Sequence, residues 1–197
     1  MKLTTTFNKL RASNACKKGY KKLAKALGGV RKYGADTEIN LLTILDANGF
    51  DDAMWSLHAT LEDSDSIKRL IACDFAESVL HIFESKRPDD DRPRKAIESA
   101  RGFVAGTVSK VVMQEARAAA YAAAYASDAA AYASDASAYA AAYAADAYAA
   151  YASAYTADAA SDAAYAAYAA SDAATREKAR SDKKKQLAAI LRKHLES

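Results

Sequence analysis

The chain has 197 residues, 51% of them hydrophobic when alanine is counted, and a formal net charge of +3. This length allows one domain with a buried core, and the absence of any strongly apolar, uncharged stretch of about 18 residues argues against a membrane-spanning helix. The first residues lack the apolar segment of a secretory signal, so we expect a cytoplasmic protein with no membrane contact.

Charge is distributed unevenly along the chain. Residues 1–35 carry ten Lys or Arg and no acidic residue, and residues 36–106 carry eight basic and fifteen acidic residues. Residues 107–175 carry two basic and seven acidic residues, and residues 176–197 carry eight and three. Basic ends around an acidic middle are explained either by pairing of the ends with the body or by a basic patch for a polyanion.

The first predicted helix covers residues 14–27, with Asn14 as its N-cap and Gly28 as its stop. Its lysines fall away from its apolar residues. The candidates for contact with a polyanion are these lysines and three near the C-terminus: Lys17, Lys18, Lys21, Lys22, Lys25, Lys183, Lys184 and Lys185.

Further helices follow in the N-terminal half. One is predicted to start at a Thr37 cap and to end at Gly49, and the next to be capped by Asp51 or Asp52. Residues 64–83 keep a helical apolar period and form the strongest core helix of the chain. Its apolar positions include Ile67, Leu70, Ile71, Phe75, Val79, Ile82 and Phe83.

Pro93 predicts the start of another helix, because its missing N–H costs nothing in a first turn. Asp91 is well placed to meet the positive end of that helix. A C-terminal helix is predicted from Arg176 to Leu195, with a narrow apolar seam on an otherwise basic segment.

Cys16 and Cys73 both fall in apolar helical patterns, so we expect two buried free thiols. No cluster of Cys and His has metal-ligand spacing, and the acidic residues around Gly49 do not follow the spacing of an EF-hand loop. We therefore expect no metal and no cofactor.

Residues 116–174 are the most unusual part of the chain, because 35 of these 59 residues are alanine and nearly all others are Tyr, Asp and Ser. Alanine is the best helix former, so this tract should be helical. Tyr and Asp recur at heptad spacing in two seams that do not share a register. The first contains Tyr121, Tyr125, Asp128, Tyr132, Asp135 and Tyr139, and the second contains Tyr148, Tyr151, Tyr155, Asp158, Asp162 and Tyr165.

A single helix through this tract would be about 100 Å long, so we predict two or more shorter helices folded back on each other. Small alanine faces let such helices approach closely. The tyrosine rings then either form a recognition face for a partner or pack between the alanine helices.

No run of alternating β-branched residues predicts a strand. We expect an all-α protein, a helical bundle with tightly packed alanine-rich helices in its C-terminal half. Composition divides the chain into an N-terminal helical part, residues 1–106, and an alanine/tyrosine/aspartate-rich part with a basic C-terminal helix, residues 107–197, which together form one compact unit.

Several short motifs, taken in chain order, resemble a known family. They are Ala15-Cys16, Ile44-Leu45-Asp46, Asn48-Gly49, Trp55, Cys73-Asp74-Phe75-Ala76 and Asp91-Arg92-Pro93-Arg94, followed by the alanine tract. Over roughly residues 12–195 the chain resembles alanine-rich immunity proteins of bacterial polymorphic toxin systems. The resemblance implies a cytoplasmic binding protein that neutralises a toxin by occupying it. A neighbouring possibility is a phage or mobile-element inhibitor of a host defence protein.

Catalysis finds little support in the sequence, because His58, His81 and His194 are far apart and no nucleophile motif or phosphate loop occurs. We therefore expect a binding protein and no enzyme. The candidates for partner contact are Trp55, Asp91, Arg92, Arg94, Tyr125, Asp128, Tyr132, Asp135 and Tyr139. The alternative is a protein that binds or sequesters nucleic acid or an anionic small ligand such as a signal nucleotide. The sequence leaves open whether the chain forms a homo-oligomer.

Overall fold

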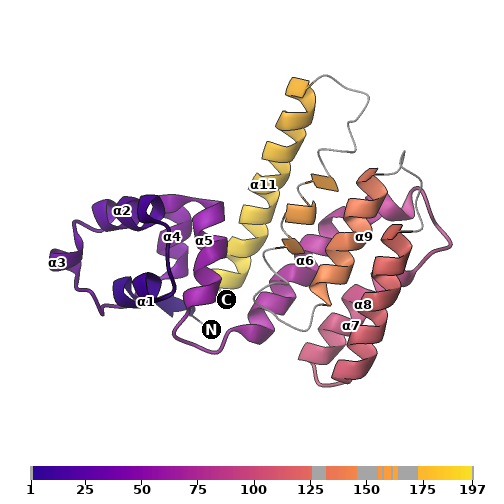
Figure 1. Ribbon diagram of the computed structural model, residues 1–197, viewed down its shortest axis with the longest axis horizontal. Helices are drawn as coiled ribbons and strands as arrows, with labels where there is room; N and C mark the ends of the chain where they lie inside the picture. The colour runs from indigo at the N-terminus through magenta and orange to yellow at the C-terminus, as the bar shows by residue number, and fades with distance from the viewer. Residues whose placement is uncertain are drawn as a thin grey trace. The chain divides into compact units, whose positions relative to one another are not determined.

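The computed structural model describes residues 2–125, 132–145, 155–156, 158–160, 162–163 and 173–196 (Figure 1). Helices make up most of these residues, which confirms the prediction of an all-α helical bundle. The chain forms two compact units, Met1–Ser64 with Leu191–Ser197 (unit 1) and Asp65–Ile190 (unit 2). The predicted division at residue 106 rests on composition and not on packing, so it stays a prediction.

Unit 1 consists of short elements joined by tight turns. They are β1 (Thr4–Thr5), α1 (Phe7–Ala12), α2 (Lys17–Ala26), α3 (Val30–Tyr33), β2 (Ile39–Asn40), α4 (Leu41–Asn48), α5 (Phe50–Ser56) and the 3₁₀ helix η1 (Leu57–Ala59). The two strands pair antiparallel, with Thr4 opposite Asn40. The expectation of no strand is therefore wrong at this one place, where two residues on each side are too few to produce an alternating pattern.

The first predicted helix starts later than expected. Asn14 adopts a left-handed conformation with φ 62° and lies before the helix. Cys16 is the N-cap of α2, and its Sγ accepts a hydrogen bond from the backbone N–H of Gly19 at 3.2 Å. Cys16 is consequently exposed, so the prediction of two buried thiols is wrong for Cys16 and confirmed for Cys73.

The next two helices also differ from prediction at their starts. Thr37 caps no helix, because Asn40 is the N-cap of α4 and its Oδ1 accepts from the N–H of Leu42 at 2.9 Å. Gly49 ends α4 as predicted and directly precedes α5. Asp51 and Asp52 therefore lie in the first turn of α5, where their charge meets the positive helix end, and neither is its N-cap.

Large apolar side chains fill the core of unit 1. Those with no more than 2% of their surface exposed include Leu3, Phe7, Leu23, Ile39, Leu41, Ile44 and Leu57. The rings of Tyr20 and Tyr33 contact Phe7 edge-on, with centroids at 5.3 and 6.0 Å. Glu62 ties the loop after η1 to β1, since its Oε2 accepts from the N–H of Thr4 at 2.8 Å.

Unit 2 is built on long helices. They are α6 (Asp65–Glu84), α7 (Arg92–Val104), α8 (Lys110–Tyr125) and α9 (Tyr132–Ala144), followed by α11 (Ala173–Glu196), whose last residues belong to unit 1. In Figure 1 α7, α8 and α9 lie side by side, and α6 packs against both α7 and α9. The predicted core helix from residue 64 and the predicted helix start near Pro93 are both confirmed.

The alanine tract folds back on itself. Tyr121 and Tyr139 are 18 residues apart, which would separate them by about 27 Å along one straight helix. Their ring centroids lie 5.7 Å apart, because α8 and α9 pack against each other. The prediction of shorter helices folded back is thus confirmed for α8 and α9. Ala123 and Ala124 of α8 meet Ala138 of α9 and Phe83 of α6 in one buried cluster.

Candidate functional site

A pocket of about 380 Å³ in unit 2 combines residues of both Tyr/Asp seams. We call it the tyrosine/aspartate pocket. It is lined by Ala136, Tyr139, Tyr143, Tyr155, Asp158, Ala159 and Asp162. Tyr139 belongs to the first seam, whereas Tyr155, Asp158 and Asp162 belong to the second. The two seams, offset in the sequence, therefore meet at one site.

Four tyrosine rings lie against one another at this pocket. Tyr121 contacts Tyr139 and Tyr143 edge-on, with both centroid distances 5.7 Å. Tyr143 stacks on Tyr139 at 6.3 Å and on Tyr155 at 5.2 Å. Tyr155 remains 47% exposed. The ring faces carry negative charge density, so the open end of the stack is suited to a cation.

A cation already lies on the inner end of this stack. The guanidinium of Arg117 is 4.9 Å from the centroid of the Tyr121 ring. Burial raises the pKa of Tyr121 to about 12, so its phenol is neutral at physiological pH. The cluster therefore acts as a set of neutral rings that attract positive charge, with no ionised phenolate at Tyr121.

The two carboxylates of the pocket add negative charge beside the rings. Asp158 is exposed, and Asp162 is half exposed. Arg180 of α11 pairs with Asp162 at 3.1 Å, and both side chains keep about two fifths of their surface exposed. An ion pair this open contributes little to stability and can exchange partners. The lining residues include no Lys or Arg, so the pocket as a whole suits a basic group.

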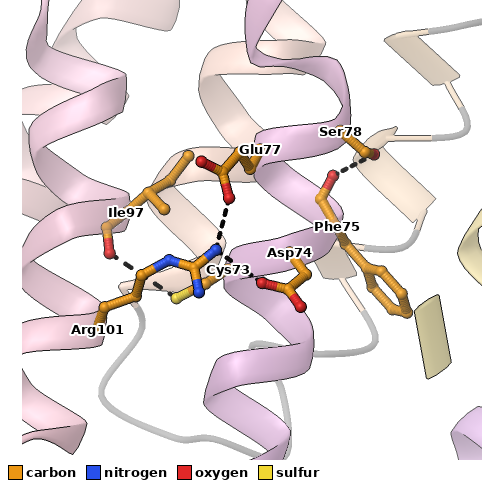
Figure 2. A network of polar contacts seen from close by, with 7 residues as sticks. All are labelled: Cys73, Asp74, Phe75, Glu77, Ser78, Ile97 and Arg101. Carbon is orange, nitrogen blue, oxygen red and sulfur yellow. Dashed lines mark hydrogen bonds and ion pairs between the residues drawn. The ribbon is translucent and has the colours of Figure 1, made fainter. Parts of the chain in front are cut away.

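The Cys-Asp-Phe-Ala segment forms the contact between α6 and α7. Figure 2 shows Arg101 of α7 reaching two carboxylates of α6, Asp74 at 2.7 Å and Glu77 at 2.6 Å. Cys73 is fully buried, and its Sγ lies 3.8 Å from the carbonyl oxygen of Ile97. Burial raises the pKa of Cys73 to about 12, which keeps it a neutral thiol. The segment therefore holds two helices together and presents no reactive nucleophile.

The loop before α7 is held by ion pairs within unit 2. Arg92 binds Asp90 through two hydrogen bonds, Nε to Oδ1 at 2.8 Å and Nη2 to Oδ2 at 2.6 Å. The side-chain hydrogen bond from Arg92 holds the pKa of Asp90 below its usual value.

The other two candidates at the start of α7 are also paired inside unit 2. Asp91 pairs with Lys95 at 2.8 Å, and Arg94 pairs with Glu84 at 2.6 Å. A partner would have to compete for these pairs, so a role in binding stays a prediction for Asp91, Arg92 and Arg94. Asp90, which binds Arg92, was not predicted, because only the folded loop shows the pairing.

Trp55 lies in unit 1 and is half-buried in the wall of a separate pocket of about 210 Å³. Of the partner-contact candidates in the alanine tract, only Tyr139 has a described side chain, and it lines the tyrosine/aspartate pocket. Asp128 and the side chains of Tyr125, Tyr132 and Asp135 lie outside the described residues. For these four positions the predicted recognition face stays a prediction.

The predicted polyanion candidates fall into two groups. Lys17, Lys18, Lys21, Lys22 and Lys25 are all exposed on α2 of unit 1. The other three belong to α11 in unit 2, where the Nζ of Lys183 donates to the carbonyl of Ser78 at 3.1 Å and Lys185 pairs with Asp182 at 2.8 Å. Burial lowers the pKa of Lys183. The lysines of α11 are thus partly used within unit 2, whereas those of α2 form an exposed basic face.

The part of the chain that the structure describes contains no candidate metal site and no candidate membrane span. No group of three or more His, Cys, Asp or Glu side chains there has a metal-binding arrangement. No helix there is both long and apolar enough to span a bilayer.

The chain matches known proteins at the level of a family model. No curated protein and no solved structure matches the chain. A family model described as Imm-5 like putative immunity protein matches residues 65–193, about two thirds of the chain. The matched range includes the Cys-Asp-Phe-Ala helix, the loop before α7 and the tyrosine/aspartate pocket. The chain therefore belongs to the Imm-5 like putative immunity protein family.

Proposed function

We propose that this chain is a cytoplasmic binding protein that neutralises a toxin protein by occupying it, through the tyrosine/aspartate pocket of unit 2. Membership of an immunity protein family supports a protective role. The observation that carries the proposal is the meeting of the two Tyr/Asp seams in one open pocket within the matched range.

The pocket suits an arginine or lysine side chain of the toxin. A guanidinium or ammonium on the face of Tyr155 gains a cation–π interaction, worth about 0.5–1 kcal/mol at an exposed site and more when water is excluded. Asp158 and Asp162 supply charge-assisted hydrogen bonds to the same cation. Tyrosine is rigid and both apolar and polar, which explains its enrichment at protein interfaces. Inhibition of this kind requires no catalytic residue in the chain.

A pull-down from nuclease-treated lysate of cells that carry the native neighbouring genes tests the proposal. We expect one protein to remain bound in stoichiometric amount and to be identified by mass spectrometry. Substitutions Tyr155→Ala and Asp158→Asn should weaken its binding, because each removes an exposed group of the pocket. The matched control is Asp89→Asn, an exposed aspartate of unit 2 that does not line the pocket.

Two results would count against the proposal. If no protein stays bound, neutralisation by occupation is wrong. If a toxin stays bound equally to wild type and to the Tyr155→Ala/Asp158→Asn double variant, the immunity role stands and the site lies elsewhere. If the bound protein is a host defence factor, the chain is a counter-defence inhibitor that uses the same pocket.

The exposed lysines of α2 support a second candidate function, the binding of nucleic acid or an anionic small ligand. Phosphate contacts make affinity fall steeply with salt. A gel-shift titration at low and at physiological ionic strength tests this function. Absence of a shift at low ionic strength would remove nucleic acid from consideration, and replacement of the five lysines by glutamine provides the control for a positive shift.

A further inference from the structure

The pocket in unit 1 lies outside the range matched by the family, so the family explains nothing about it. Four helices contribute to its walls, including α1 through Leu10. Gly19, Tyr20 and Leu23 come from α2, Ile44 and Asn48 from α4, and Asp52 and Trp55 from α5. The lining is mostly apolar, and its polar groups include Asn48, Asp51 and Asp52.

Asn48 and Asp52 of the lining are held in a defined geometry. The amide nitrogen of Asn48 donates to the carbonyl of Gly19 at 2.8 Å and to Oδ2 of Asp52 at 2.7 Å. Gly19 is required for this approach, because a Cβ there would lie 2.7 Å from Oδ2 of Asp52. Asn48 thereby fixes α2 to α5, and the Asp52 carboxylate has a set position in the pocket wall.

The polar groups of the wall are mainly acceptors. Asp51 and Asp52 are carboxylates in the first turn of α5, and both line the pocket. Both N–H groups of the Asn48 amide are used, and its buried Oδ1 has no hydrogen-bond partner among the described residues. An apolar interior beside two carboxylates favours a ligand with an apolar stem and a positively charged donor head.

Aromatic rings favour a positive charge on that head. Trp55 is half-buried in the pocket wall, and tryptophan is the ring that binds cations best. The neighbouring ring of Tyr20 already holds a cation, because the guanidinium of Arg11 lies 5.5 Å from its centroid and donates to its hydroxyl at 3.1 Å. Trp55 is therefore the ring that serves an incoming group.

The lysines of α2 do not supply the positive charge that this pocket suits. A step of 100° per residue places Lys17, Lys18, Lys21 and Lys25 on the side of the helix opposite Gly19 and Leu23. Lys22 lies nearer the rim, and its ammonium is held by the carbonyl oxygen of Asn48 at 3.0 Å. The carboxylate of Asp52 thus faces the pocket from a wall whose lining includes no Lys or Arg.

The size of the pocket indicates what kind of ligand fits. Its volume of about 210 Å³ is below the roughly 300–1,000 Å³ of typical small-molecule sites. A single long side chain is a better match than a nucleotide or a cofactor. We infer that this pocket binds one arginine or lysine side chain of a partner protein, with its methylene stem on Leu23 and Ile44 and its charged head between Asp52 and Trp55.

This inference is independent of the proposed function, because every residue that lines the pocket lies outside the matched range. Trp55 is the single tryptophan of the chain, so its fluorescence reports on this pocket. The test is a fluorescence titration of the full chain with N-acetyl-L-arginine amide and with its neutral analogue N-acetyl-L-citrulline amide. We expect a saturable change with the arginine compound and binding weaker by about tenfold with the citrulline compound, because only the former brings a charge.

Two variants test whether the arginine compound binds at Asp52. Asp52→Asn keeps an oxygen that accepts from Asn48, so α2 and α5 should stay joined, and it should weaken arginine binding by about tenfold. Asp36→Asn, a matched exposed aspartate of the same unit outside the pocket lining, should leave the affinity unchanged. Circular dichroism of both variants controls for folding.

Three results would overturn the inference. Equal affinity for the arginine and citrulline compounds would show that the pocket does not select charge. Unchanged affinity of Asp52→Asn would show that the cation binds elsewhere. The absence of any saturable change up to the solubility limit of the arginine compound would show that the pocket takes no basic side chain.

Discussion

Unit 1 and the α8–α9 contact of unit 2 are both formed by packed helices, but their cores use side chains of very different size. The core of unit 1 contains Phe7, Leu23 and Ile44, whereas the α8–α9 contact is formed by Ala123, Ala124 and Ala138. Full burial of a leucine or phenylalanine contributes about 1.5–3 kcal/mol, and one alanine methyl contributes far less. The two regions must therefore be stabilised in different ways.

The alanine helices compensate through propensity, close approach and the tyrosine cluster. Alanine loses no side-chain entropy in a helix, and its small size lets α8 and α9 approach closely. The partly buried rings of Tyr121, Tyr139 and Tyr143 then supply the large apolar surfaces that alanine lacks. It follows that unit 1 should be most sensitive to loss of volume, and the α8–α9 contact to gain of volume.

The largest expected effect is from truncation of the unit 1 core. Phe7→Ala should reduce the free energy of unfolding by about 3–5 kcal/mol, because Phe7 is fully buried and the loss of its ring leaves a cavity beside Tyr20 and Tyr33. Urea denaturation followed by Trp55 fluorescence measures it in the same unit. Leu61→Ala, at a site 48% exposed, is the control and should change stability by less than about 0.5 kcal/mol. A loss below about 1 kcal/mol for Phe7→Ala would contradict this account of the core.

A smaller effect is expected from enlargement in the alanine contact. Ala123→Leu should destabilise unit 2 by about 1–3 kcal/mol, since Ala123 is fully buried against Ala138 and Phe83 and a larger side chain would push α8 from α9. Thermal unfolding followed by circular dichroism measures it. Ala118→Leu lies on the exposed side of the same helix and should be nearly neutral, because leucine has a helix propensity close to that of alanine. Equal stability of the two variants would show that the α8–α9 contact tolerates volume.

Sequence reasoning found the long helices because their apolar residues repeat at helical spacing. Ile71, Phe75 and Val79 mark α6, and Pro93 marks the start of α7. It misplaced the start of α2, because asparagine serves equally well as an N-cap and in the left-handed conformation that Asn14 adopts.

The candidate site was predictable only in part. Heptad spacing identified both Tyr/Asp seams, and Tyr139 was a candidate residue. That Tyr139 and Tyr155 line one pocket depends on where the alanine helices end, and no Gly or Pro in the tract marks those positions. The contact of Arg101 with Asp74 and Glu77 likewise joins two helices and leaves no local pattern.

The third prediction concerns the polar contact between α6 and α7. Arg101→Met keeps the apolar stem but loses both ion pairs, and it should cost about 1 kcal/mol, because Arg101 and its partners Asp74 and Glu77 remain a third to a half exposed. Thermal unfolding measures the change. Lys95→Met breaks the more exposed pair with Asp91 and should cost less than Arg101→Met. If the two losses are equal, Arg101 adds nothing to the packing of α6 on α7.

The smallest expected effect is a pH dependence confined to unit 1. Burial raises the pKa of Glu62. Hydrogen bonds from the side chain and the backbone N–H of Thr4 together lower the pKa by more than burial raises it, so the net pKa lies below its usual value. A lowered folded-state pKa means that the carboxylate stabilises the fold above the unfolded-state value of about 4.3 and loses this contribution as pH falls through the folded-state value.

Glu62→Gln should therefore be less stable than wild type at pH 7, and the difference should shrink as the pH falls below about 4. Urea denaturation followed by Trp55 fluorescence at several pH values measures this difference, with Glu38→Gln as the control at an exposed glutamate of the same unit. A difference that stays constant over this range would mean that Thr4 binds the protonated carboxyl group as well as the carboxylate. The tie between β1 and the loop after η1 would then depend on the shape of the acceptor and not on its charge.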